Sequence, residues 1–297
     1  MTQPIAVLGL GGIGGMIAVR TCAVCVGTAR TVEAIQASGL TFVHGETTTV
    51  AHLAAVERLE SPVELLVVAV KAYDLDSALG RIAPEALAGA VVLPLLNGLE
   101  HVEAIRARLR PSDTVVVAGS IGRFEALSPT PGVVVQRSPG DALVTVASRE
   151  LSGGALDAAV EPLRVPGIEV VVDGGEPAVL WEKAARLAVL AAATVSSGLA
   201  VGQLRADATW CSRLREALAE ACAVAIVDGV ELDFSGQWAI IEAMPDDLTT
   251  SAARDAALGR PTELDAITGS VVRAGARLGV PTPALARLLE EASCRAP

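Results

Sequence analysis

The first half of the 297-residue chain alternates short apolar runs with stretches of helical periodicity. Wholly apolar runs that end in glycines or charged residues are typical of strands buried in a parallel sheet. Apolar runs occupy residues 5–8, 23–26, 65–70 and 91–96, and the run at residues 114–118 is apolar after its first residue, Thr114. Helical patterns separate them. The alternation predicts an α/β domain built on a parallel sheet.

Two further pairs of β-rich runs belong to the same half. Residues 41–43 and 47–50 flank His44-Gly45-Glu46, a spacing that favours a hairpin. Residues 143–147 and 169–172 are expected to be the last strands of this domain.

The pattern changes after Asp173-Gly174-Gly175, where strand signals end. Only helical patterns follow, over residues 177–195, 206–227, 248–258, 263–278 and 283–292. The chain is therefore predicted to divide near Gly174. We expect a Rossmann-type parallel-sheet domain over residues 1–174 and an all-helical domain over residues 175–297.

Composition narrows the function classes. With 52% hydrophobic residues the chain has enough apolar surface to fold, which excludes a disordered protein. A net charge of -11 would repel a phosphate backbone, and 2% aromatic residues leave little for stacking on bases. We therefore expect no nucleic-acid partner and a small-molecule substrate instead.

Membrane insertion and metal binding are also disfavoured. The longest uncharged run, Leu187–Leu204, contains several polar and glycine residues, so a buried helix is the better interpretation. The N-terminus lacks the basic and cleavage segments of a signal peptide. Five scattered cysteines form no zinc pattern. These features predict a cytoplasmic protein without a metal site or a membrane anchor.

The strongest local motif is Gly9-Leu10-Gly11-Gly12-Ile13-Gly14, which follows the first predicted strand and opens a helix. Glycines at this spacing permit a tight turn and let a pyrophosphate approach the backbone and the helix N-terminus. We therefore assign cofactor binding to Gly9, Gly11, Gly12, Ile13 and Gly14. The alternative is a glycine-rich turn without a ligand.

The type of dinucleotide is indicated by the residues after the second strand. NAD-binding versions of this motif carry an acid there for the ribose hydroxyl. Here Arg30 ends the run, and Glu33 lies in the following helix, where a helix-terminal role explains it. Lys71 adds a cation after the strand at residues 65–70. These cations favour NADP (NADPH) over NAD, although a solvated loop lysine would also explain Lys71.

Several longer motifs resemble the ketopantoate reductase (2-dehydropantoate 2-reductase) family. Besides the glycine motif they are Val70-Lys71-Ala72-Tyr73-Asp74, Leu96-Asn97-Gly98-Leu99-Glu100, Leu180-Trp181-Glu182-Lys183, Gly259–Ile267 and Gly279–Pro283. The resemblance covers nearly the whole chain. It implies a Rossmann domain, a helical domain and an NADP-dependent oxidoreductase that reduces a 2-oxo acid to a 2-hydroxy acid.

The resemblance also implies roles for individual residues. Lys183 matches the family's catalytic lysine, which donates a proton to the ketone oxygen. Glu263 matches the family's glutamate, which orients the lysine or the substrate oxygen. Ser251 stands where the family binds the substrate carboxylate, and Asn97 where an asparagine lies near nicotinamide and substrate. Plain structural roles remain open alternatives: Pro261-Thr262-Glu263 also resembles a helix start, and Asn97-Gly98 a turn.

The sequence departs from the family on the helix that carries Lys183. The family usually has asparagines four and eight residues after the lysine, on the same helix face. Here these positions are Leu187 and Ala191. The substrate would then present an apolar group there, or Arg186 would replace a polar contact, or the lysine would be held less well. The actual substrate stays undetermined.

Two function classes remain open from sequence. One is an NADPH-dependent reductase of a ketopantoate-like 2-oxo acid or related ketone. The other is an NADPH-binding family member that has lost or changed the reduction, such as an imine reductase, a cofactor sensor or a protein with a non-redox role. The stereochemical outcome and the oligomeric state are also open, with a homodimer among the options.

Overall fold

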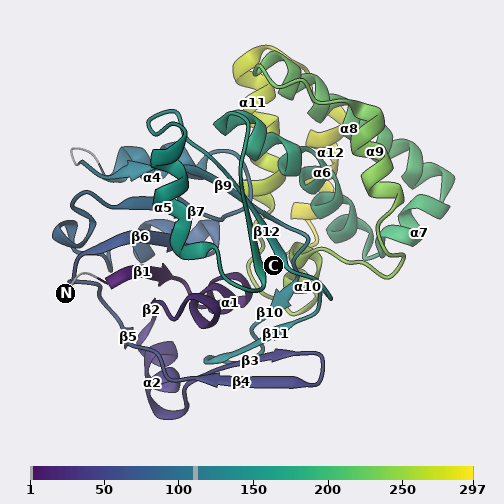
Figure 1. Cartoon of the computed structure of the whole chain (residues 1–297). Coiled ribbons are helices and arrows are strands. Elements are labelled where there is room, and N and C mark those ends of the chain that lie inside the picture. Colours follow the sequence, from purple (N-terminus) through teal and green to yellow (C-terminus); the bar gives the residue numbers. More distant parts are fainter. Residues whose placement is uncertain (1–2, 110–112, 297) are drawn as a thin grey trace. The chain divides into compact units, whose positions relative to one another are not determined.

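The computed structural model describes residues 3–109 and 113–296, which form two compact units (Figure 1). The first unit runs to Leu96 and then comprises His101–Val179. The second comprises Asn97–Glu100 and the chain from Leu180 onward. The second unit therefore includes a short loop from the first half of the sequence, which the sequence pattern did not indicate.

A six-stranded parallel sheet forms the centre of the first unit, with the strand order β5-β2-β1-β6-β7-β8. These strands are β1 (Gln3–Leu8), β2 (Val24–Val26), β5 (Ala55–Val56), β6 (Val63–Val68), β7 (Val91–Pro94) and β8 (Val115–Val116). The order reverses between β1 and β6, as in Rossmann folds, where ligands bind at the carboxyl ends of the strands beside such a reversal. The predicted Rossmann-type parallel sheet is confirmed.

Two smaller sheets hold the remaining strands, which the sequence analysis did not assign to a particular sheet. The predicted hairpin, β3 (Leu40–His44) and β4 (Thr47–Ala51), is joined by β11 (Val133–Gln136) and β10 (Ala126–Leu127). The last strands, β12 (Ala142–Ala147) and β13 (Ile168–Val172), pair with each other and with β9 (Ala118–Gly122). The alternating buried and half-buried positions of β11 and β12 suit sheets that are covered mainly on one face.

Helices flank the sheets of the first unit. They are α1 (Gly12–Thr21), α2 (Ala29–Ser38), α3 (Leu75–Leu79), α4 (His101–Leu109) and α5 (Gly154–Val160), with 3-10 turns at Ala72–Asp74, Pro84–Leu87 and Glu161–Leu163. The apolar core between helices and sheets is aliphatic, because Met16, Ile17, Leu65 and Leu93 are fully buried. This explains how the chain folds with few aromatic residues.

The second unit is helical. It contains most of α6 (Glu176–Ser197), then α7 (Val201–Ala206), α8 (Ala208–Val227), α9 (Phe234–Glu242), α10 (Ser251–Ala257), α11 (Ser270–Leu278) and α12 (Pro283–Ser293). The sequence analysis missed α9. The predicted helix over residues 263–278 is regular only in part, because Asp265–Gly269 forms a π-helical turn before α11.

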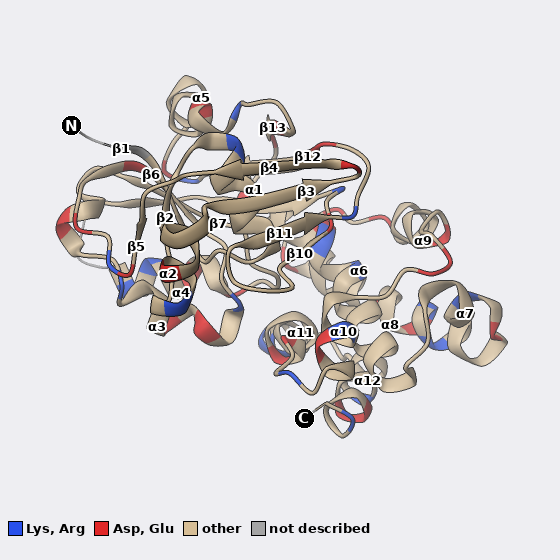
Figure 2. Cartoon of the chain, turned by 90° about the horizontal axis from the view of Figure 1, so that it is seen from below, with Lys and Arg blue, Asp and Glu red and all other residues tan. Residues whose placement is uncertain are grey.

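Charged residues lie mostly on helices and loops, while the strands are largely free of them (Figure 2). This distribution follows from the buried apolar strands of the central sheet. Within residues 3–109 and 113–296, no helix combines the length and hydropathy needed to cross a membrane.

A buried ion pair holds the first turn of α6 within the first unit. The Arg106 guanidinium donates to both carboxylate oxygens of Glu176, at 2.5 and 2.9 Å, and to the Val116 carbonyl at 2.6 Å. The two side chains are 4% and 9% exposed. The Glu176 carboxylate also accepts the backbone N–H of Arg149. The pair thus connects α4, β8 and α6.

Replacing Arg106 with Met should lower the free energy of unfolding by about 3 kcal/mol, because the Glu176 carboxylate would stay buried without its cation. Urea titration measures this loss. The double variant Arg106→Met/Glu176→Met should recover part of it, since it removes both charges.

Arg108→Met is the matched control for that prediction. Arg108 lies on the same helix and pairs with Asp76, but both side chains are largely exposed. Its removal should change stability by less than about 0.5 kcal/mol. A loss below about 1 kcal/mol for Arg106→Met would contradict the structural importance of the pair.

Candidate active site

The glycine motif forms a tight loop between β1 and α1. Gly9 has φ +95°, and its N–H donates to the Val26 carbonyl. A Cβ on Gly14 would lie 1.8 Å from the Gly9 carbonyl oxygen, so only glycine lets the helix start so close to the strand. A Cβ on Gly11 would meet no atom within 4 Å. The loop therefore packs tightly against the protein at Gly9 and Gly14, and leaves open space at Gly11.

Other residues of the motif pack α1 against its own unit. A Cβ on Gly12 would lie 2.3 Å from the Ala126 carbonyl oxygen in β10, and one on Gly15 would lie 2.4 Å from Val134 in β11. Ile13 is half-buried and packs against the core. Gly12 and Ile13 could thus contact a ligand through their backbone N–H groups, while their positions are fixed by packing.

The predicted phosphate-binding cations follow neighbouring strands. Register pairs Leu8 with both Val26 and Val68, so the loops after β1, β2 and β6 emerge at one edge of the sheet. Arg30 does not end β2, as predicted from sequence, but is the second residue of α2. Lys71 is half-buried at the start of the first 3-10 turn and engages other residues.

Arg30 is available to a ligand. Its side chain is exposed and forms no ion pair with the described residues, and Glu33 on the same helix is also exposed. A dinucleotide needs an open glycine for its pyrophosphate, free N–H groups at a helix start and, for NADP, a cation for the 2'-phosphate. Gly11, α1 and Arg30 supply these features, so the residues fit the cofactor predicted from sequence.

The second unit holds the predicted catalytic residues. Lys183 lies on α6 between the buried residues Trp181 and Ala184, and is itself half-buried. Loss of solvent around the ammonium lowers the pKa of Lys183 to about 8. The Glu263 carboxylate acts to raise this pKa, and the Arg186 guanidinium acts to lower it further. Lys183 is therefore poised to gain and lose a proton near neutral pH.

Lysine is rare in this chain, which makes the lysine at position 183 notable. The chain contains 23 Lys and Arg residues, of which only Lys71 and Lys183 are lysines. Arginine cannot deprotonate in proteins, whereas a buried lysine changes its pKa readily. The chain thus places one of its two titratable ammonium groups at the position that the sequence predicted to be catalytic.

Glu263 lies immediately before the irregular helix and is 5% exposed. Its carbonyl accepts the Ile267 N–H, so it also serves as a helix start, as the alternative interpretation held. The following π-helical turn is tied to α6, because the Thr268 hydroxyl donates to the Ala188 carbonyl at 2.7 Å. This contact joins the elements that carry Glu263 and Lys183. Neither Thr268 nor the π turn was recognised from sequence.

Asn97 belongs to the same unit through the loop Asn97–Glu100. Gly98 has φ +93°, and a Cβ there would lie 1.9 Å from the Ala266 carbonyl oxygen in the π-helical turn. Gly98 therefore has the turn role proposed as an alternative, and this turn brings Asn97 to the segment that follows Glu263. Asn97 itself is half-buried.

The face of α6 beyond Lys183 is apolar. Leu187 is half-buried and Ala191 is fully buried. Arg186, which directly precedes Leu187, donates to Gln237 on α9, a residue that the sequence analysis did not consider. Burial lowers the pKa of Arg186. Arg186 is thus held by α9, which gives it a defined position beside the lysine.

Ser251 is the first residue of α10 and is half-buried. The preceding Thr250 caps the helix by accepting the Ala253 N–H at 3.2 Å, and its hydroxyl lies 2.7 Å from that of Thr194 on α6. The Ser251 hydroxyl forms no hydrogen bond with the described residues. Thr250 therefore provides the structural cap and leaves Ser251 available to a ligand.

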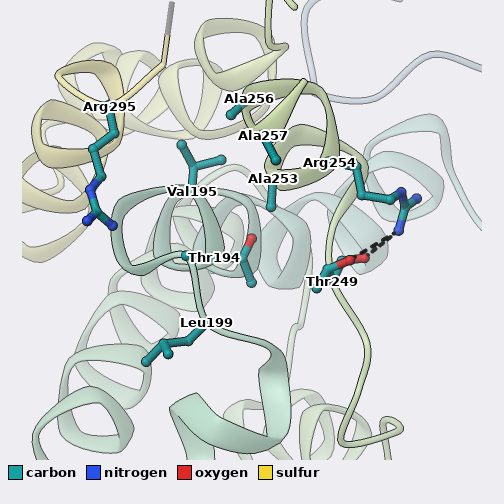
Figure 3. Close-up of a pocket in the computed structure, with 10 residues that line it drawn as sticks. Thr194, Val195, Leu199, Thr249, Ala253, Arg254, Ala256, Ala257 and Arg295 are labelled. Atoms are coloured by element: carbon teal, nitrogen blue, oxygen red, sulfur yellow. Dashed lines mark hydrogen bonds between the residues drawn. The ribbon is translucent and has the colours of Figure 1, made fainter. Parts of the chain in front are cut away.

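A cavity of about 340 Å³ lies between the last turns of α6 and helix α10 (Figure 3). Its walls include Thr194, Val195 and Leu199 on one side and Ala253 and Arg254 on the other, and Arg254 donates to the Thr249 carbonyl. Thr194 is eleven residues after Lys183, or about 16 Å along a helix axis. The cavity is therefore too distant to hold an atom that reacts at Lys183.

Comparisons with known proteins identify the family of the chain. Residues 5–148 match the family model "Ketopantoate reductase PanE/ApbA", and residues 178–294 match its C-terminal counterpart. A 2-dehydropantoate 2-reductase of Mycobacterium tuberculosis is 32% identical over 228 residues, covering 75% of this chain and 72% of the relative.

Solved structures are similar over nearly the whole chain. A PanE/ApbA family ketopantoate reductase from Ralstonia eutropha JMP134 is 26% identical with a TM-score of 0.82, covering 98% of each chain. D-mandelate dehydrogenase, solved with NADH and anilino(oxo)acetate, is 22% identical with a TM-score of 0.84, also covering 98% of each chain. The latter likeness shows the fold alone.

The titration of Lys183 can be measured directly. In a Lys71→Arg variant, ¹³C-methylated Lys183 is the single modified lysine, and its NMR shift should titrate near pH 8 instead of near the ordinary value of about 10.4. Glu263→Gln should lower this midpoint and Arg186→Gln should raise it, because each removes one of the two opposing charges. A midpoint above pH 10 would contradict the desolvated site.

Proposed function

Because the chain belongs to the ketopantoate reductase family, we propose that it reduces a 2-oxo acid to a 2-hydroxy acid with NADPH. The observation that carries the proposal is the half-buried Lys183. Burial lowers its pKa to about 8, while Glu263 acts to raise this pKa and Arg186 acts to lower it. A proton donor works best when its pKa lies near the working pH. No other described lysine lies in the helical unit.

The chain's residues would divide the reaction as follows. When bound, NADPH supplies the hydride that reaches the carbonyl carbon. The Lys183 ammonium donates its proton to the carbonyl oxygen, which otherwise would become an alkoxide. Glu263 favours the protonated lysine before the reaction. Ser251 would bind the substrate carboxylate through its free hydroxyl, and Asn97 would hydrogen-bond near the reacting carbonyl.

The substrate is proposed to carry an apolar group toward Leu187 and Ala191. An unpaired amide facing hydrocarbon costs free energy, so this face favours a substituent that needs no hydrogen bond there. A 2-oxo acid with a branched alkyl or aromatic side chain meets that requirement. Arg186, which donates to Gln237, directly precedes Leu187 on the same helix.

The same apolar face supports a second candidate function. If the family's amides are needed to hold the lysine in place, their replacement by Leu187 and Ala191 would leave a protein that binds NADPH without reducing a ketone. The buried Glu263 and the lowered pKa of Lys183 favour the reductase, since a pure cofactor sensor would not need a desolvated ammonium.

The test of the reductase is consumption of NADPH, followed at 340 nm, with a panel of 2-oxo acids that includes ketopantoate and larger apolar side chains. We expect turnover that declines as the pH rises above about 8, because Lys183 then loses the proton it must donate. Lys183→Met should reduce kcat by about 10²- to 10⁴-fold and leave NADPH affinity nearly unchanged.

Arg295→Met is a control variant for this assay, since Arg295 borders the separate cavity, donates to the Ser196 carbonyl and should have little effect on kcat. Restoring amides with Leu187→Asn/Ala191→Asn should raise the rate with ketopantoate if the site is a modified ketopantoate site. Tight NADPH binding without turnover across the panel would refute the reductase and support the second candidate.

The cofactor proposal makes a separate prediction for Arg30 and Gly11. Arg30→Ala should weaken NADPH far more than NADH, because only NADPH carries the phosphate that Arg30 would bind. Gly11→Ala should weaken both, since its methyl group would enter the open side of the loop, yet the fold should remain stable because no protein atom lies within 4 Å of that position. Isothermal titration and thermal unfolding measure the two effects.

Gly154→Ala controls for a general effect of glycine replacement, because a Cβ there also meets no atom within 4 Å and the residue opens α5 away from the motif. Equal weakening of NADPH and NADH by Arg30→Ala would contradict a 2'-phosphate contact.

A further inference from the structure

The loop Asn97–Glu100 is fixed at both ends by the segment that follows Glu263. At its start, Gly98 lies against the Ala266 carbonyl, where a Cβ would come within 1.9 Å. At its end, the Glu100 carboxylate accepts two hydrogen bonds from Arg273 on α11, from Nε at 2.9 Å and from Nη2 at 2.8 Å.

Arg273 is itself anchored to the first residue of the π-helical turn. Its Nη1 donates to the Asp265 carboxylate at 2.7 Å, and its Nη2 donates to the Asp265 carbonyl at 3.0 Å. Gly269 lies beneath this bridge, because a Cβ there would come within 2.9 Å of Asp265 Oδ1 and 3.0 Å of Arg273 Nη1. A side chain at position 269 would displace the pair.

The π-helical turn explains why these two residues meet. Eight residues of regular α-helix separate side chains by about 800°, which places them about 80° apart around the axis. A π turn contains about one extra residue, so the same separation advances only about 700°. Asp265 and Arg273 then lie within about 20° of each other on one face. The irregular helix thus aligns Arg273 with Asp265.

An isolated surface ion pair would not suffice to fix a loop, since exposed pairs contribute little. Arg273 and Glu100 are 45% and 49% exposed, but their contact is bidentate and the same guanidinium is held by Asp265 at two further points. Planar fork geometry of this kind fixes orientation as well as distance. These contacts raise the pKa of Arg273 above its ordinary value.

We propose that Arg273 is a positioning residue that holds Asn97 in place by clamping Glu100 to the π-helical turn next to Glu263. The inference rests on the proposed function, because the contact of Asn97 with substrate is itself part of that proposal. Arg273 itself touches no reacting group. Its effect on catalysis is expected to pass through Asn97.

The chain offers an unusually direct probe, because Asn97 is its only asparagine. Labelling the full-length protein with ¹⁵N-asparagine gives one backbone amide signal and one side-chain NH₂ pair. In the wild type these signals should be sharp and dispersed. In Arg273→Met and in Glu100→Gln they should broaden or shift toward the values of a mobile asparagine, while Arg273→Lys should restore them in part.

Arg277→Met is the matched control, since Arg277 lies one turn further along α11 and pairs with Asp228 instead. It should leave the Asn97 signals unchanged. Unchanged Asn97 signals in Arg273→Met would overturn the proposal. Because this measurement needs no turnover, failure of the proposed reductase activity and failure of the clamp are distinguishable.

Activity provides the second readout. With the best 2-oxo acid of the panel, Arg273→Met should lower kcat/KM about 10-fold when Asn97 is present and less than 2-fold in an Asn97→Ala background. A merely structural role would give the same fold-loss in both backgrounds, and that result would also overturn the proposal. Thermal unfolding of all four proteins checks that loss of stability does not produce the difference.

Discussion

The arrangement of the helical unit depends on the cost of keeping an ammonium group away from water. Desolvation lowers the pKa of Lys183 to about 8, and the buried Glu263 carboxylate limits this effect. A carboxylate on a separate element can do so only if that element is fixed against α6. The hydrogen bond from Thr268 to the Ala188 carbonyl provides this connection. The π-helical turn therefore contacts both α6, through Thr268, and the loop that carries Asn97, through Gly98.

The composition of the chain supports the same conclusion. Arginine supplies almost every positive charge and forms the structural pairs with Glu176 and Glu100. Arginine suits these pairs because it stays charged and binds carboxylates with a planar fork. The chain contains only two lysines and one asparagine. At Lys183 and Asn97 the chain thus uses rare residue types whose chemistry, a shiftable proton and a neutral amide, the abundant types cannot replace.

Local patterns predicted the central sheet and the glycine loop because both depend on short-range rules. Buried parallel strands need continuous apolar runs, and the turn from β1 to α1 needs glycine where Gly9 and Gly14 approach each other. The π-helical turn was not predicted, because the pattern over residues 263–278 was interpreted as one regular helix. The division of the remaining strands into two smaller sheets was not predicted, because it depends on pairing between strands far apart in sequence. Helix α9 was also missed. Arg30 was placed at the end of the second strand, because the helix was expected to begin at Thr31 and Thr28 was not recognised as its N-cap.

The replacement of two amides by Leu187 and Ala191 affects proton transfer as well as substrate choice. An amide four residues after Lys183 would lie on the same helix face and could solvate the ammonium. A leucine there cannot accept a hydrogen bond, so it adds to the desolvation that is the main cause of the lowered pKa. Arg186 acts in the same direction, and only Glu263 opposes them. The apolar face therefore couples two properties: a substituent that displaces water from Leu187 would also make Lys183 a stronger acid at the moment the substrate binds.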